Sequence, residues 1–153
     1  MKKISILILL FSFIFLMSCG IFEQYEDTNG ADNYSLQSIT EEMLLKDDRG
    51  LQIGAVTNST RNSDEQKIKK SVHQFDGVEE LARIKSGSYD IILDFKVSSG
   101  NTRLVLTDGS KVIYEFLINE DNQTYSFEAN QTYYLKLAGE SLGYELNAVI
   151  TKK

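Results

Sequence analysis

Hydrophobic and polar residues alternate most regularly between residues 88 and 98. Odd positions there are apolar or aromatic, and several even positions are charged. The odd face carries Tyr89, Ile91, Leu93, Phe95 and Val97, and the even face carries Asp90, Asp94 and Lys96. A period of two is typical of a β-strand with one buried face and one solvated face. The pattern therefore predicts a strand that buries its odd positions.

The same period recurs in shorter runs up to residue 151, with turn residues between them. Their apolar positions are Leu104 and Leu106; Val112, Tyr114, Phe116 and Ile118; Tyr125 and Phe127; Tyr133, Leu135 and Leu137; and Tyr144, Leu146, Ala148 and Ile150. Turns are predicted at Ser99-Gly100-Asn101, at Asp108-Gly109, which is a hairpin signal, and between Gly139 and Gly143. Short strands with one apolar face each predict an all-β fold, an antiparallel β-sandwich or barrel-like arrangement of about 7–9 strands.

The pattern is less regular before residue 85. "LQIGAVTN", which starts at Leu51, predicts a strand. "KIKKSVHQF" brings Ile68, Val72 and Phe75 near one another, and "VEELARIK" suits a helical turn as well as a strand.

A short helix is predicted over residues 39–46. Ser38 and Glu41 have the spacing of a capping box, and an apolar stripe can form from Ile39, Met43 and Leu44. The alternative is that these residues extend the polar, acidic tether that we expect over residues 19–35.

The N-terminus has the layout of a secretory signal peptide. Two lysines, Lys2 and Lys3, precede an uncharged apolar run over residues 4–17. This run is shorter than the roughly 20 residues that a transmembrane helix needs. A removable signal is therefore the better interpretation.

The end of that run resembles the lipobox of bacterial lipoproteins. Leu16 stands three places before Cys19, and the small residue Ser18 stands directly before it. The resemblance implies that the Cys19 sulfur receives a diacylglycerol and that the chain is cut before Cys19. Residues 1–18 would then be the signal and residues 36–153 the β-sandwich domain. The alternative is an ordinary secretory signal in which Cys19 is incidental.

The domain also resembles small sandwich domains common in lipoproteins of Gram-positive bacteria. The similarity lies in Ser99-Gly100 followed by Leu104 and Leu106, in Ser110 to Ile113, and in Tyr133 to Gly139. It implies a fold and a location outside the cytoplasm, and it brings no known activity or functional residue with it.

Composition limits the classes of function. The formal charge of −6 becomes about −8 once Lys2 and Lys3 leave with the signal. An acidic domain is a poor nucleic-acid binder, because phosphate contacts need a cationic surface. Cys19 is the only cysteine, so no disulfide is expected after lipidation, and the domain depends on its core for stability.

Few residues suggest catalysis. His73 is the only histidine, and a surface or satisfied strand residue is its simplest interpretation. Asp90 and Asp94 share a strand face about 13 Å apart, too far for a glycosidase pair. We expect no catalytic residues, no cofactor and no enzymatic activity.

Two further features are candidates for binding. The turn "NEDN" offers Asn119 and Asp121 as weak Ca²⁺ ligands, although a solvated turn is the simpler interpretation. Tyr134 points opposite to Tyr133, so one of the two rings should lie outside the core. Such a ring can stack on a sugar or peptide, but the simpler interpretation is that it lies across neighbouring strand residues.

The sequence thus predicts a lipoprotein held on the outer side of the cell membrane by the lipid on Cys19. Its expected role is non-catalytic binding of a protein, a wall component or a toxin at the cell envelope, including immunity or exclusion. The alternative is a structural accessory subunit of a membrane complex.

Overall fold

The computed structural model describes residues 39–46 and 49–153, which fall within the unit Leu36–Lys153. Leu16, Ser18 and Cys19 lie outside the described residues, so the structure does not test the lipobox prediction. Within the described part, no helix is long and hydrophobic enough to span a bilayer.

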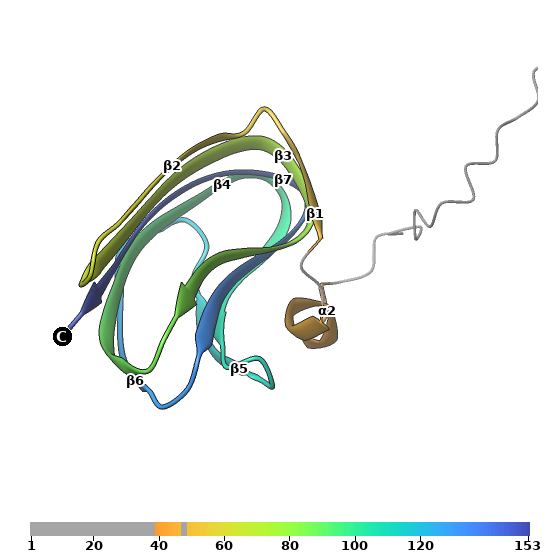
Figure 1. Cartoon of the computed structure of the whole chain (residues 1–153). Helices are drawn as coiled ribbons and strands as arrows, with labels where there is room; N and C mark the ends of the chain where they lie inside the picture. Colours follow the sequence, from red (N-terminus) through yellow and green to blue (C-terminus); the bar gives the residue numbers. More distant parts are fainter. Residues whose placement is uncertain (1–38, 47–48) are drawn as a thin grey trace, which may run out of the picture. The chain divides into compact units, whose positions relative to one another are not determined.

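In the described residues, seven antiparallel strands form one sheet (Figure 1). In chain order they are β1 Gly50–Ile53, β2 Val56–Arg61, β3 Glu65–Ile84, β4 Gly87–Thr107, β5 Val112–Phe116, β6 Glu120–Ala129 and β7 Tyr133–Lys152, and the helix α2 Glu41–Lys46 precedes them. The long strands are adjacent in the order β3-β7-β4. Strands β1 and β2 pair with the outer side of β3, and β5 and β6 pair with the outer side of β4.

Each long strand bends near its middle, and the sheet folds over on itself. The register of β3 against β7 shifts between Val72 and Gly77, and that of β4 against β7 shifts between Val97 and Asn101. Figure 1 shows the three long strands curving over together, with β6 and β5 at opposite ends of the curve. The first half-sheet contains β2, β6 and residues 65–72, 87–97 and 144–152. The second half-sheet contains β5 and residues 77–84, 102–107 and 133–139.

Side chains from both half-sheets fill the space between them. Ile91, Leu93 and Phe95 of the first half-sheet belong to the same buried cluster as Leu104 and Leu135 of the second. Burial of each such side chain contributes roughly 1.5–3 kcal/mol. The predicted all-β antiparallel sandwich is therefore confirmed, although its two layers are halves of one bent sheet.

Two expectations about turns are wrong. Ser99-Gly100-Asn101 and the segment from Gly139 to Gly143 lie at bends inside β4 and β7, not at loops between short strands. Gly100 has φ of 78°, and a Cβ there would collide with the carbonyl oxygens of Glu140 and Ser141. The turn signal is real, but it produces a bend within a continuous ladder, so the strands are longer than expected.

The ambiguous segment "VEELARIK" is the end of β3, with a bulge between Glu80 and Ala82. The bulge explains the mixed period, because an extra residue shifts the alternation by one position. In addition, "LQIGAVTN" forms two strands with a break after Ile53.

The predicted helix is present as α2 and covers the outer face of the second half-sheet. Leu44 is fully buried in a second cluster with Val78, Val105 and Ala138. Its N-cap is Thr40, whose Oγ1 accepts a hydrogen bond from the Met43 backbone N–H at 3.3 Å.

Ser38, the expected capping-box partner of Glu41, lies outside the described residues, so that contact stays a prediction. Glu41 accepts a hydrogen bond from the Val112 backbone N–H at 3.0 Å, which ties the helix to β5.

Candidate binding edge

One edge of the sheet is formed by β1 and β2, and we call it the open edge. Both strands pair with β3 alone, and no other strand pairs with them in the described part of the chain. Strand β1 lies beside the bend of β3, and β2 continues along the first half-sheet (Figure 1). An unpaired edge presents backbone N–H and C=O groups that another extended segment can pair with.

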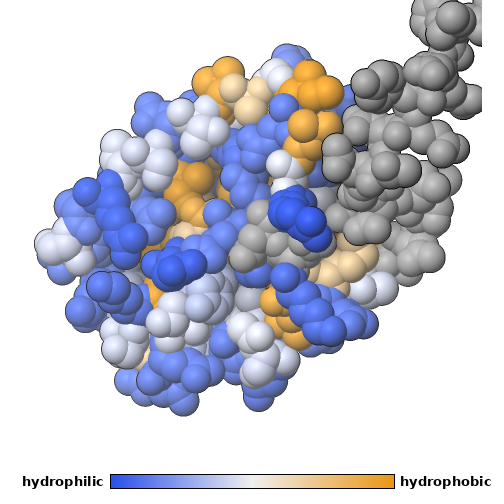
Figure 2. All heavy atoms as spheres, turned by 45° about the vertical axis from the view of Figure 1, so that its right-hand side comes forward, coloured by the Kyte–Doolittle hydropathy of each residue, from blue (hydrophilic) through white to orange (hydrophobic). Residues whose placement is uncertain are grey.

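Three aliphatic side chains stand exposed along the open edge, and we call them the apolar row. Leu51, Ile53 and Val56 are 67%, 55% and 71% exposed. Figure 2 shows hydrophobic residues gathered at the top of the molecule, at the height of the β1–β2 turn in Figure 1. Scattered exposed aliphatics are normal, whereas these three lie on the two strands of one edge.

The register explains why the apolar row faces solvent. Leu51 is paired with Asp76 and Val56 with Ser71, and these β3 positions are on the outer face of the sheet. Gln52, between Leu51 and Ile53, points inward instead and donates a hydrogen bond to Glu79. The alternation that normally buries aliphatic residues is therefore inverted in β1.

His73 packs beside the apolar row. Gly54, in the turn after β1, has φ of 65°, and a Cβ there would collide with the His73 ring. The imidazole therefore lies directly against the turn that separates Ile53 from Val56. His73 also lines a shallow hollow of about 290 Å³ with Ser71, Lys96 and Glu145. The only histidine of the sequence thus contributes to a surface next to the β1–β2 turn.

Strand β2 is exposed along its whole length. All six residues of "VTNSTR" are exposed, so no element of the described chain covers either face of this strand. Natural edge strands are usually protected by charges, proline or bulges. Between Val56 and Thr60 the strand has none of the three.

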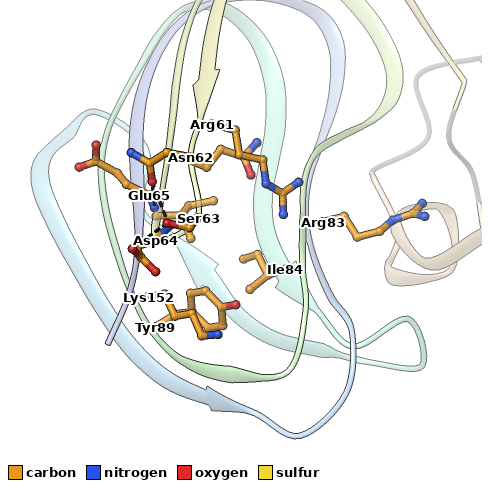
Figure 3. A pocket seen from close by; sticks show the side chains of 11 residues that line it. Arg61, Asn62, Ser63, Asp64, Glu65, Arg83, Ile84, Tyr89 and Lys152 are labelled. Atoms are coloured by element: carbon orange, nitrogen blue, oxygen red, sulfur yellow. Dashed lines mark hydrogen bonds between the residues drawn. The ribbon is translucent and has the colours of Figure 1, made fainter.

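A cleft lies at the far end of β2 (Figure 3). Its apolar floor includes Ile84, and the Tyr89 ring and Lys152 lie beside it, with Arg61 on the opposite side. Its volume is about 40 Å³, which suits the end of one side chain better than a whole ligand.

The wall of this cleft is the tight turn between β2 and β3. The Asn62 side-chain oxygen accepts hydrogen bonds from the backbone N–H groups of Asp64 and Glu65, at 2.9 and 2.6 Å. The Asp64 carbonyl accepts a hydrogen bond from the Lys152 backbone N–H at 2.7 Å, which ties the turn to the end of β7. The cleft is therefore formed by well-connected backbone.

Charge is distributed unevenly between the two edges of the sheet. Residues 49–73 contain five basic residues, of which Lys70 is buried, and two acidic residues, although the whole chain has a formal charge of −6. On the opposite edge, β6 contains Glu120, Asp121 and Glu128 and no basic residue. The open edge is thus a locally basic region of an acidic protein.

The predicted binding aromatic, Tyr134, lies in the middle of the sheet and not at the open edge. It is half-buried, between Arg83 on β3 and Thr107 on β4. The Arg83 guanidinium lies over its ring, 5.4 Å from the centroid. Part of the ring surface that a sugar or peptide would use is therefore occupied by a side chain of the protein.

The weak Ca²⁺ candidates are used in protein contacts. The Asn119 side-chain oxygen accepts a hydrogen bond from the Val97 backbone N–H at 2.8 Å. Asp121 pairs with Lys96 at 2.8 Å, and this hydrogen bond raises the pKa of the lysine. Within the described chain, no group of three or more His, Cys, Asp or Glu residues is arranged to hold a metal ion.

Asp90 and Asp94 likewise have structural partners. Hydrogen bonds from Lys153 and then from Ser126 hold the pKa of Asp90 below its usual value. Asp94 accepts a hydrogen bond from the Asn122 backbone N–H at 2.7 Å. Both carboxylates therefore make structural contacts where β4 lies beside β6.

No family model matches this sequence, and no curated protein matches it either. Among solved structures, a cupin domain from Bordetella pertussis Tohama I aligns with 11% identity over 67% of this chain and 97% of that chain, with a TM-score of 0.37. The C-terminal CBM6 of LamC, a marine laminarinase from Zobellia galactanivorans, aligns with 16% identity over 68% and 100% of the chains, with a TM-score of 0.35. KdgF from Halomonas sp. aligns with 13% identity over 65% and 81%, with a TM-score of 0.33. Similarities at this level carry no argument about function.

Proposed function

We propose that this protein is a lipid-anchored lipoprotein outside the cytoplasm, whose sandwich domain binds a protein partner without catalysing a reaction. The main support is the apolar row on the open edge. Leu51, Ile53 and Val56 are exposed together beside unpaired backbone, which is the combination that a protein partner can cover. Hydrophobic contact and backbone pairing are both available at this edge.

The location comes from the sequence. The lysines, the short apolar run and the Leu16-to-Cys19 segment together support lipidation at Cys19. Two acyl chains on one sulfur would give a durable anchor, since a single chain holds only weakly. The acidic domain as a whole would be repelled by anionic headgroups, so the proposed anchor is the lipid and not a basic surface.

The absence of catalysis is part of the proposal. The acidic residues that sequence analysis considered, Asp90, Asp94 and Asp121, all pair with groups of the protein. His73 packs against Gly54. These contacts explain the residues without a reaction, whereas no described part of the chain covers the apolar row.

Site-specific photo-crosslinking of the full-length protein in its native cells tests the proposal. A benzoylphenylalanine placed at position 53 should give one dominant protein adduct, and the same residue at the exposed position 124 of β6 should not. The adduct should disappear when Leu51→Ser and Val56→Ser are combined. The matched control is Leu117→Ser with Ile118→Ser, which removes two other exposed aliphatics, 60% and 45% exposed, and should leave the adduct intact. No adduct at position 53, or equal adducts at positions 53 and 124, would contradict the proposal.

A further inference from the structure

We propose that β2 is a template for strand addition, and that its occupant is an extended acidic segment of the partner protein. This inference rests on the proposed function and specifies how the open edge is used. Three observations support it. The outer backbone edge of β2 has no pairing strand among the described residues, and the open edge is basic. In addition, the cleft that Arg61 lines, which we call the Arg61 cleft, lies at the end of the strand.

The backbone of β2 has the geometry that strand addition requires. Its six residues pair in unbroken register with β3, from Val56 opposite Ser71 to Arg61 opposite Gln66. In such a ladder about half of the residues direct their N–H and C=O groups away from the neighbouring strand. Along the roughly 20 Å of β2, an extended segment can pair with these groups without any rearrangement of the fold.

The side chains of β2 do not obstruct an incoming strand. From Val56 to Thr60 they are small or β-branched and uncharged. Strand β2 is continuous with the apolar row at one end and with the Arg61 cleft at the other. A segment along β2 therefore meets an apolar surface first and a cationic group last.

Charge selects an acidic occupant. Arg61 is at the end of β2, and the exposed Lys67 and Lys69 follow on the neighbouring strand. Lys67 is paired with Glu65 at 2.9 Å, which leaves Arg61 and Lys69 as the groups best placed to face a carboxylate on the added strand. Complementary charge at an interface contributes both specificity and a faster association rate.

The same charges disfavour a second copy of this chain at β2. Symmetric pairing of β2 with β2 would bring two basic edges together. Pairing of β2 with the acidic β6 of another copy is compatible in charge, but each added molecule would leave another β2 unpaired. Such a head-to-tail association forms a ring only if its rotation closes, and otherwise it produces filaments. A different protein with an acidic strand can pair with the free backbone groups of β2 without exposing another copy of β2.

The first test identifies the occupant. Benzoylphenylalanine at positions 58 and 60 of the full-length protein should capture the same partner as position 53, and mass spectrometry should map the adduct to one segment with several Asp or Glu residues. A segment without acidic residues, or a segment from β6 of this same chain, would overturn the inference. Failure to capture any protein at positions 53, 58 and 60 would overturn both this inference and the proposed function.

The second test asks whether the segment binds as a strand. The captured segment is synthesised as a peptide, together with two versions that carry backbone N-methyl groups at alternate residues, odd in one and even in the other. Binding to the detergent-solubilised full-length protein is measured by fluorescence anisotropy. An added strand directs only every second N–H toward β2, so one version should lose at least about tenfold in affinity while the other binds like the parent peptide. Equal behaviour of the two versions would overturn strand addition.

The third test concerns charge. Arg61→Glu and Lys69→Glu should each lower the affinity for the parent peptide by about tenfold. The matched control Lys111→Glu, an exposed lysine in the β4–β5 turn, should have no such effect. If the charge variants bind normally while the Leu51→Ser and Val56→Ser variant loses the partner, the binding function stands and the acidic strand is wrong.

Discussion

Lys70 and Glu79 form an ion pair inside the fold, although both belong to the same strand. They lie on either side of the bend in β3, so the pair connects the first half-sheet to the second. Lys70 is 4% exposed, the Glu79 side chain is 23% exposed, and Gln52 donates to the second Glu79 oxygen at 2.7 Å. The pair therefore holds the two layers together at the point where β1 joins the sheet.

Removing one partner of this pair should be strongly destabilising. Lys70→Met leaves the Glu79 charge without its counterion, and we expect a loss of about 3 kcal/mol in the free energy of unfolding, with partial access of water to Glu79 limiting the effect. The double variant Lys70→Met with Glu79→Leu should recover part of this loss. Urea denaturation measures both. In the exposed pair with Asp121, Lys96→Met should change stability by less than about 1 kcal/mol, and an equal loss in the two lysine variants would refute the structural role.

Tyr144 provides a second test of the interior. Its ring packs edge-on against Phe75 and Phe95, and its hydroxyl has no hydrogen-bond partner among the described residues. Tyr144→Phe should therefore raise the free energy of unfolding by about 1 kcal/mol at neutral pH. A lower stability of the variant would show that the hydroxyl has a partner.

The same tyrosine predicts a dependence on pH. Burial, and then the negative charge of Glu79, raise the pKa of Tyr144 well above its ordinary value of 10.0. The folded state holds this proton above pH 10 while the unfolded state releases it, so unfolding becomes easier as pH rises. Relative to Tyr144→Phe, the unchanged protein should lose up to about 1.4 kcal/mol per pH unit above pH 10, and nothing below it. A constant difference across pH 7–11 would contradict this assignment.

The bend in β4 depends on a glycine. At Gly100 a Cβ would collide with two carbonyl oxygens of β7, so Gly100→Ala should cost about 3 kcal/mol or prevent folding. Gly109 has a similar φ of 87°, but a Cβ there would meet nothing closer than 3.5 Å, so Gly109→Ala should cost only about 1 kcal/mol. Thermal and urea unfolding compare the two. Equal losses would mean that the close approach of β7 does not matter.

The anchor can be tested separately from the fold. Cys19→Ala in the full-length protein should abolish incorporation of radioactive fatty acid, because the sulfur is the proposed acceptor. Ser35→Ala, a substitution in the expected tether, should incorporate label normally. Label retained in the Cys19→Ala variant would show that the lipid is elsewhere or that the lipobox interpretation is wrong.

Much of the fold could be predicted from the sequence because the period of two is strong after residue 88. The prediction that Ile91, Leu93 and Phe95 share a buried face is confirmed. The bends could not be predicted, because Gly100 gives the same local signal in a bend as in a hairpin turn. Only the neighbouring β7 decides between them.

The binding edge was less accessible to prediction for a physical reason. Periodicity shows which residues share a face, but it does not show which face is buried. Leu51 and Ile53 resemble a core face, yet in the structure they are exposed. Conversely, Lys70 is buried where a lysine is expected to be solvated, because Glu79 meets it across the bend.

Hydrogen exchange of the full-length protein, with and without its captured partner, tests the central claim most directly. Strand β2 is an exposed edge strand, so the amides of residues 56–61 that point away from β3 should exchange quickly in the free protein. With the partner bound, several of these amides should become protected, while those of β6 on the opposite edge should not change. Unchanged exchange over residues 56–61 with the partner bound would show that β2 is not the binding edge.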